Sequence, residues 1–105
     1  MADFEAVLKV SDLPPGEVAK VEVGLTPVIV GNVNGSYFAV GNTCPHAELP
    51  MIEDRGELDG EVVECEYHGS QFDVTTGGVV NGPAVLPVQQ FAVKVEGDDI
   101  LVGPA

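Results

Sequence analysis

The two cysteines and two histidines of this 105-residue chain occur as two short pairs. Cys44 and His46 form the first pair, and Cys65 and His68 form the second. Every thiol and every imidazole that could bind a metal therefore lies in one of these two segments. Thiolate and imidazole ligands suit zinc, copper and iron–sulfur clusters, whereas calcium and magnesium prefer oxygen. The pattern predicts a soft metal centre to which two matched loops each contribute one cysteine and one histidine.

The spacing within the pairs favours one kind of centre. Zinc sites of the Cys₂His₂ type usually group cysteine with cysteine and leave two to four residues between paired ligands. A Rieske [2Fe–2S] cluster needs two cysteines on one iron and two histidines on the other, so mixed pairs suit it. A Cys–His nucleophile needs only one such pair. Zinc, a catalytic thiol and two unliganded thiols with incidental histidines remain the alternatives.

The surrounding residues carry a family resemblance. The C-x-H and C-x-x-H motifs, followed by Gly69-Ser70-Gln71-Phe72-Asp73, resemble the Rieske iron–sulfur family. Nearly the whole chain is similar to the small Rieske-type ferredoxins of bacterial aromatic-ring-hydroxylating dioxygenases, such as the biphenyl, naphthalene or carbazole systems. Gly82-Pro83-Ala84 and the closing segment 95–102 support this likeness. The spacer between the two motifs is a residue or two longer than is usual in the family.

The resemblance implies one [2Fe–2S] cluster as the cofactor and assigns its ligands. Cys44 and Cys65 would hold the buried iron, and His46 and His68 would hold the outer iron. Neutral imidazoles in place of two thiolates remove negative charge from the cluster and raise its potential.

Further residues around the ligands are also assigned by the resemblance. Ser70, which follows Gly69, would donate a hydrogen bond to a bridging sulfide. Phe72 stands where high-potential relatives carry a tyrosine, so that donor is missing here. Pro83 would lie in a loop that covers the cluster.

The function implied by the resemblance is electron transfer. A one-electron carrier of this kind would pass electrons from an NAD(P)H-dependent ferredoxin reductase to a terminal Rieske non-haem iron oxygenase that hydroxylates an aromatic compound. It would not be an enzyme by itself. A Rieske subunit of another multi-subunit oxidoreductase and, more remotely, a zinc-binding interaction module are the alternatives. The identity of the aromatic substrate depends on the oxygenase.

The formal net charge of −13 restricts the partners. It argues against nucleic acid and anionic membranes, and it favours proteins with basic docking patches. Solubility alone is the alternative explanation, and it accounts for the total charge equally well. Glu48, Glu64, Glu66 and Pro45 adjoin the ligand motifs, so we expect them to take part in docking. Transient docking to two partners in turn is typical of a monomer.

Length and terminal sequence suggest the organisation of the chain. We expect a single domain over residues 1–105, with a cluster-binding subdomain over about 42–86. The first residues carry neither a basic nor an apolar stretch, and no apolar run is long enough to span a membrane. These features predict a cytoplasmic protein.

Alternating apolar residues and turn signals predict an all-β fold, an antiparallel β-sandwich of short strands with two ligand loops and a proline loop. Asn34-Gly35 is the clearest hairpin turn. Segment 51–59 is polar, and we expect it to be irregular or a short helical turn. The expected strands cover residues 4–10, 18–23, 27–33, 36–40, 60–66, 72–74, 79–80, 91–96 and 100–102.

Overall fold

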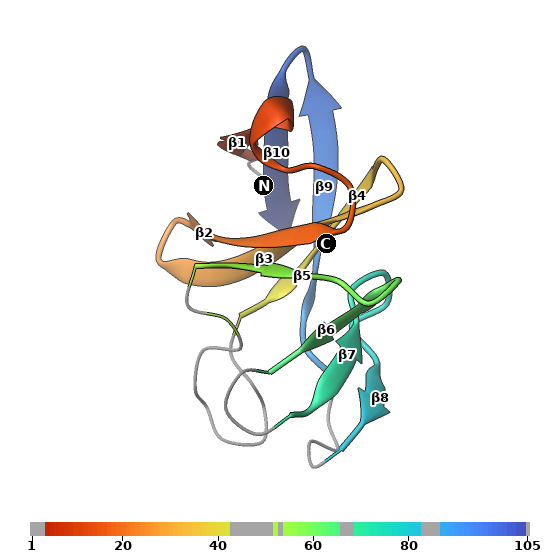
Figure 1. Cartoon of the computed structure of the whole chain (residues 1–105). Helices are drawn as coiled ribbons and strands as arrows, with labels where there is room; N and C mark the ends of the chain where they lie inside the picture. Colours follow the sequence, from red (N-terminus) through yellow and green to blue (C-terminus); the bar gives the residue numbers. More distant parts are fainter. Residues whose placement is uncertain (1–3, 43–51, 53, 66–68, 83–86, 105) are drawn as a thin grey trace.

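The computed structural model describes residues 4–42, 52, 54–65, 69–82 and 87–104 (Figure 1). Within these ranges every strand pairing is antiparallel, and no helix is long and apolar enough to cross a membrane. The prediction of an all-β chain is confirmed. The elements are β1 (Glu5–Lys9), a 3-10 turn η1 (Val10–Asp12), β2 (Glu17–Val23), β3 (Thr26–Val33), β4 (Ser36–Gly41), β5 (Arg55–Glu57), β6 (Val62–Glu64), β7 (Gln71–Asp73), β8 (Val79–Asn81), β9 (Gln90–Glu96) and β10 (Asp99–Pro104).

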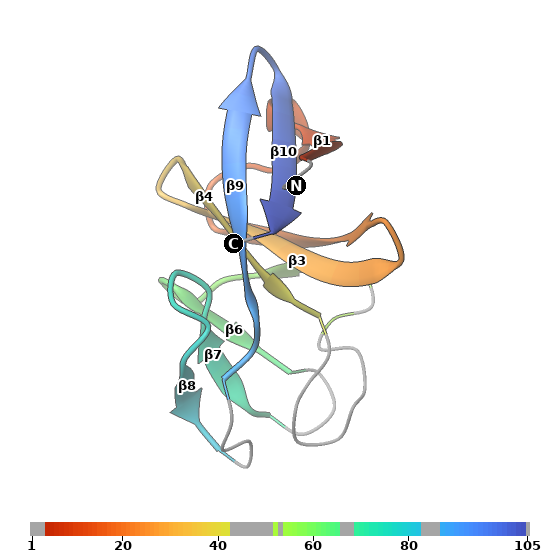
Figure 2. The ribbon, with the colours of Figure 1, turned by 180° about the vertical axis from the view of Figure 1, so that it is seen from behind.

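The strands form two sheets of unequal size. The large sheet has the order β1-β10-β9-β4-β3-β2-β5, and the small sheet has the order β6-β7-β8. Strands β1 and β2 also contact each other although they are not neighbours in the sheet order, so the large sheet curls over itself. The β9–β10 turn and the small sheet lie on opposite sides of β2 and β3 in both views (Figures 1 and 2).

Strand β3 separates two hydrophobic cores because its side chains alternate between its two faces. Val28 and Val30 belong to the core inside the curled large sheet, whereas Ile29 belongs to the core between the large and small sheets. All three are fully buried, as expected for a strand covered on both faces. Burying a side chain of this size contributes roughly 1.5–3 kcal/mol.

The second core attaches the small sheet to the large one, in the sandwich-like layering that the strand pattern predicted. Its fully buried members come from the central strands of the large sheet, from the small sheet and from the segments that connect them. They are Val18, Ile29, Val40, Ile52, Val63, Cys65, Phe72, Val74 and Val88.

Strand β5 corrects one prediction, because residues 55–57 are not irregular. Arg55 pairs with Ala19 and Gly56 pairs with Val18, which makes β5 the edge of the large sheet. A three-residue edge strand with exposed polar ends has no apolar alternation, so its sequence gave no strand signal. The first strand also ends one residue earlier than expected, since Val10 begins a 3-10 turn.

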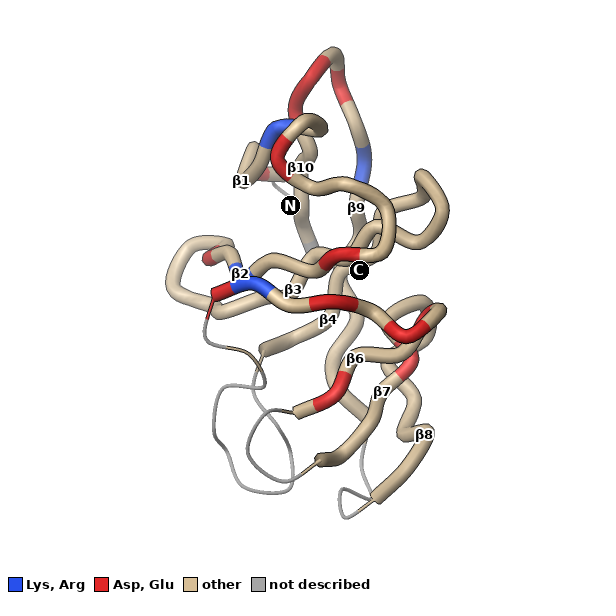
Figure 3. Tube along the Cα trace, viewed as in Figure 1, with Lys and Arg blue, Asp and Glu red and all other residues tan. Residues whose placement is uncertain are grey.

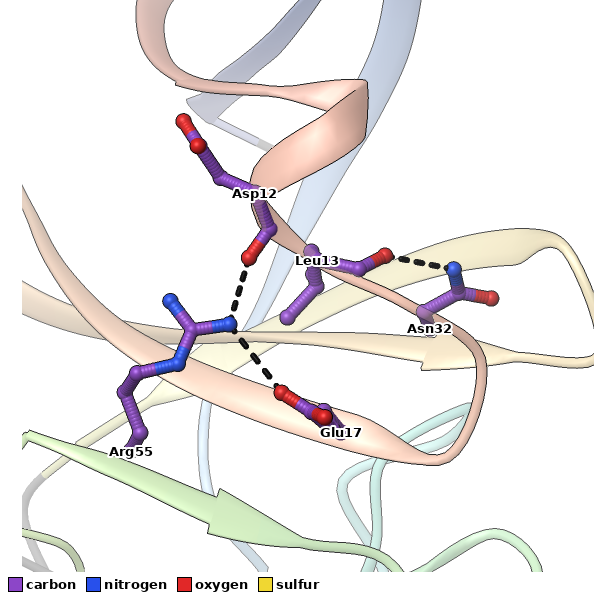
Figure 4. Close-up of polar contacts among 5 residues, drawn as sticks. All are labelled: Asp12, Leu13, Glu17, Asn32 and Arg55. Carbon is purple, nitrogen blue, oxygen red and sulfur yellow. Dashed lines mark hydrogen bonds and ion pairs between the residues drawn. The ribbon is translucent and has the colours of Figure 1, made fainter.

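Polar contacts join β5 and the end of β3 to the chain between β1 and β2 (Figure 4). The guanidinium of Arg55 donates hydrogen bonds to the backbone carbonyl of Asp12 and to the carboxylate of Glu17, the latter at 3.1 Å. The buried amide of Asn32 donates to the carbonyl oxygen of Leu13 at 2.8 Å. These contacts hold the long β1–β2 connection against the edge of the large sheet.

The predicted hairpins are confirmed. Asn34 and Gly35 have φ angles of +53° and +94°, the left-handed conformation that a type I′ turn requires at both positions. Strands β7 and β8 form the next predicted hairpin, and β9 and β10 form the terminal one.

Candidate metal centre

Cys65 immediately follows β6, at the point where the β6–β7 hairpin opens into its loop. Its N–H donates to the carbonyl oxygen of Ser70 at 2.7 Å, and its own carbonyl oxygen accepts from the N–H of Gly69 at 3.0 Å. These two bonds close the base of the second ligand loop. The thiol is unbridged, and the residue is only 1% exposed.

Gly69 and Ser70 have distinct local roles in this closure. Gly69 has a φ angle of +75°, in the left-handed region that costs a residue with a Cβ atom about 1–2 kcal/mol. Ser70 is fully buried directly before β7.

Phe72 and Glu64 lie on opposite faces of the β6–β7 hairpin. The ring of Phe72 is fully buried in the core that also contains Cys65. Glu64 is exposed, and its carboxylate accepts a hydrogen bond from the side-chain amide of Gln71 at 3.1 Å. The hairpin therefore presents a carboxylate to solvent beside a buried thiol.

The remaining predicted site residues fall outside the part of the chain that the structure describes. Among the described residues no group of three or more His, Cys, Asp or Glu side chains could hold a metal, and Cys65 is the one expected ligand present there. The residues outside are Cys44, His46, His68, Pro45, Glu48, Glu66 and Pro83.

Asn42 directly precedes the segment that contains the first ligand motif. Its side-chain amide donates to the carbonyl oxygen of Ile52 and accepts from the N–H of Ile52, both at 3.0 Å. These two residues flank segment 43–51, which contains the first ligand motif. Nothing in the sequence distinguishes Asn42 from the polar residues of an ordinary turn, because its partner is ten residues away.

A third closure lies beside the segment that contains the Gly-Pro motif. The N–H of Val88 donates to the carbonyl oxygen of Gly77 at 2.9 Å, which joins the residues just before β9 to the β7–β8 turn. The N–H of Gly41 donates to the carbonyl oxygen of Gln89 at 2.8 Å, next to Asn42. Hydrogen bonds thus connect the sheets to residues that flank all three segments assigned to the cluster, namely the two ligand segments and the proline segment.

Negative charge follows the chain from β5 to the second ligand loop (Figure 3). In residues 54–65, Arg55 is the one basic side chain, and it is paired with Glu17. The carboxylates of this stretch are all exposed, so their charge faces solvent. They belong to Asp54, Glu57, Asp59, Glu61 and Glu64.

The chemistry of these residues fits an iron–sulfur cluster. Cys65 offers a soft thiol that lies in an apolar core and forms no disulfide. Coordination to a metal deprotonates a cysteine thiol outright, and thiolate is a ligand that iron–sulfur clusters use. The position of Cys65 at the base of a closed loop is compatible with metal ligation.

Comparison with known proteins identifies the family. The model of the Rieske [2Fe–2S] domain matches residues 3–92. The ferredoxin component of biphenyl 2,3-dioxygenase from Rhodococcus jostii is 46% identical over 91 residues, which cover 87% of this chain and 83% of the relative. The ferredoxin subunit of biphenyl dioxygenase from a Pseudomonas strain is 38% identical over 94% of this chain and 90% of its own.

Solved structures agree with the sequence matches. The ferredoxin of carbazole 1,9a-dioxygenase from Nocardioides aromaticivorans superposes with a TM-score of 0.87 at 33% identity, covering 97% of this chain and 98% of that one. A complex of reduced oxygenase and oxidised ferredoxin in carbazole 1,9a-dioxygenase contains a chain with a TM-score of 0.84 at 35% identity, covering 94% of this chain and 91% of that one. The predicted Rieske fold and the predicted family are confirmed, and this chain belongs to the Rieske [2Fe–2S] family, with a single [2Fe–2S] cluster as its cofactor.

Proposed function

We propose that this protein carries single electrons from an NAD(P)H-dependent ferredoxin reductase to a terminal Rieske non-haem iron oxygenase that hydroxylates an aromatic compound. The observation that supports this most strongly is the 46% identity to a dioxygenase ferredoxin component over most of both chains. In this role the protein is an electron-transfer component, and the substrate chemistry takes place in the oxygenase. The cytoplasm, where reduced nicotinamide cofactors are available, is its proposed location.

The proposed cluster ligands are Cys44 and Cys65 for one iron and His46 and His68 for the other. The burial of Cys65 supports its place on the inner iron, away from solvent. The bound cluster supplies a site that accepts and releases one electron. The protein residues hold that site in a fixed geometry, so that little reorganisation accompanies each transfer.

Four more residues support the ligands in this proposal. Ser70, buried beside Cys65, donates its hydroxyl hydrogen toward a cluster sulfur. Gly69 allows the loop to return to the hairpin with a positive φ. Phe72 excludes water from the inner side, and Pro83 covers the cluster from a third side. The cluster-binding part of the single domain extends over about residues 42–86, although β5 within it belongs to the large sheet.

Docking uses the acidic surface next to the cluster. The exposed carboxylate of Glu64 is one residue from Cys65, and the proposal adds Glu48, Glu66 and Pro45 from the ligand segments. Both partners present basic patches to this surface. Opposite charges accelerate encounter, and small interfaces allow the carrier to leave each partner quickly. The carrier acts as a monomer.

Metal analysis of the purified protein tests the proposal. We expect two irons and two acid-labile sulfides per chain, the EPR spectrum of a histidine-ligated [2Fe–2S] cluster, and loss of both from Cys65→Ser. Stopped-flow mixing with a dioxygenase reductase and then with its oxygenase should show reduction and reoxidation of the cluster. Stoichiometric zinc without sulfide would overturn the cluster assignment. Permanent co-purification in a larger complex would instead favour a fixed oxidoreductase subunit.

A further inference from the structure

Asn42 joins the two ends of the first ligand segment. It directly follows β4, is fully buried, and makes two hydrogen bonds of 3.0 Å through its side chain to the backbone of Ile52. A side-chain amide can donate to a carbonyl through its nitrogen while it accepts from an N–H through its oxygen. The pair therefore satisfies both backbone groups of Ile52 within the core.

The junction is anchored on both sides. The N–H of Asn42 donates to the carbonyl oxygen of Pro27 at 3.0 Å, next to the start of β3. The N–H of the preceding Gly41 donates a hydrogen bond to the carbonyl oxygen of Gln89, which directly precedes β9. Ile52 itself packs in the core between the two sheets, together with Cys65. Asn42 thus connects both ends of segment 43–51 to the same sheets that hold the second ligand loop.

We propose that Asn42 is a positioning residue for the cluster, which acts by holding both ends of segment 43–51 so that Cys44 and His46 stay in register with Cys65. This inference rests on the ligand assignment proposed above. Holding the two ends of a loop together costs conformational entropy, so the ends tend to separate unless a contact joins them. If the junction opens, the ligands of the first segment lose their register with those of the second, and solvent and chelators gain access to the iron.

The chain provides a matched control for this residue. Asn32 is also buried, and its side-chain amide also makes two backbone bonds, donating to the carbonyl oxygen of Leu13 at 2.8 Å and accepting from the N–H of Gly35 at 2.7 Å. It lies on β3, and neither Leu13 nor Gly35 borders a ligand segment. The same substitution at Asn32 removes an equivalent donor from a buried amide at a site unrelated to the cluster.

The test compares Asn42→Asp with Asn32→Asp as purified, cluster-loaded proteins. Aspartate preserves the shape and one acceptor but cannot donate to the backbone carbonyl. We measure unfolding by denaturant, the rate at which visible absorbance is lost to an iron chelator, the EPR g values and the midpoint potential. Asn42→Asp should lose its cluster at least about tenfold faster than the wild-type protein, in line with the usual effect of residues that orient metal ligands, and its g values should shift. Asn32→Asp should keep wild-type g values and potential.

The results separate three outcomes. If both variants lose the cluster only in proportion to their lost stability, with unchanged g values, Asn42 is an ordinary structural residue and the inference is wrong. If Cys44→Ser and His46→Ala keep the wild-type spectrum, the ligand assignment fails first. If Asn42→Asp does not fold, Asn42→Ser and Asn32→Ser, which retain one hydroxyl for hydrogen bonding, give the same comparison.

Discussion

The carbonyl oxygen of Val88 lies 2.5 Å from the position that a Cβ atom of residue 77 would occupy. Only glycine allows this approach, and Gly77 also has a φ angle of +78°. Its carbonyl oxygen accepts the N–H of Val88 at 2.9 Å. The β7–β8 turn and the residues just before β9 are therefore in direct backbone contact.

Replacing Gly77 with alanine should destabilise the protein more than the same change at Gly60. Both glycines have positive φ angles, so both substitutions carry a backbone cost of about 1–2 kcal/mol. A Cβ at residue 60 meets no atom within 4 Å, whereas one at residue 77 must displace backbone. Overpacking of this kind adds about 1–3 kcal/mol. Denaturant unfolding of the two variants measures the difference, and equal losses would show that the turn can shift freely.

Removal of the cluster should loosen the small sheet before the large one. Strands β6, β7 and β8 have three residues each, and the core that attaches them contains Cys65, one of the proposed cluster ligands. Metal binding contributes directly to the folding free energy of the residues it joins. Hydrogen exchange after anaerobic chelation should rise in residues 62–81 and change little in β3 and β10. Uniform exchange across both sheets would contradict this dependence.

Ser70→Ala should lower the midpoint potential. Rieske centres span about −150 to +300 mV, and without a tyrosine at position 72 this one should lie toward the lower end. A hydroxyl bond that is about 1 kcal/mol stronger in the reduced state corresponds to about 40 mV for one electron. Ser36→Ala, at the exposed start of β4, is the control and should leave the potential unchanged. Protein-film voltammetry measures both variants, and an unaltered potential in Ser70→Ala would exclude a bond from its hydroxyl to sulfur.

Glu64→Lys should slow electron transfer more than Asp98→Lys. Both substitutions change the charge by the same amount at exposed sites, but Glu64 adjoins Cys65, whereas Asp98 lies in the β9–β10 turn. That turn and the small sheet lie on opposite sides of β2 and β3 (Figure 1). Charge attraction acts over a screening length of about 8 Å at physiological ionic strength.

Stopped-flow association rates at rising salt check this prediction. The wild-type rate should fall with salt, and the rate for Glu64→Lys should be lower and less dependent on salt. If the two variants behave alike, the acidic surface serves solubility, and docking depends on apolar residues near the cluster.

Local sequence patterns are sufficient to predict the family and most of the strands. Two Cys–His pairs are a local pattern whose chemistry needs no knowledge of the fold, and the family match over residues 3–92 confirms that interpretation. The Asn34-Gly35 turn was also predictable from the sequence, because asparagine and glycine have an intrinsic preference for the left-handed conformation that this turn requires. Strand β3 has the run of apolar and β-branched residues that is typical of a strand buried on both faces.

The tertiary structure alone decided the features that depend on distant partners. Polar β5 is a strand because β2 offers it hydrogen bonds across a long sequence separation. Asn42 has a structural role because its side chain hydrogen-bonds the backbone of Ile52. Position 77 requires glycine because the carbonyl oxygen of Val88 approaches it closely. Each of these residues has an unremarkable local sequence. Burial and hydrogen bonding between segments far apart in the chain assign their roles, and local propensity carries no information about such pairings.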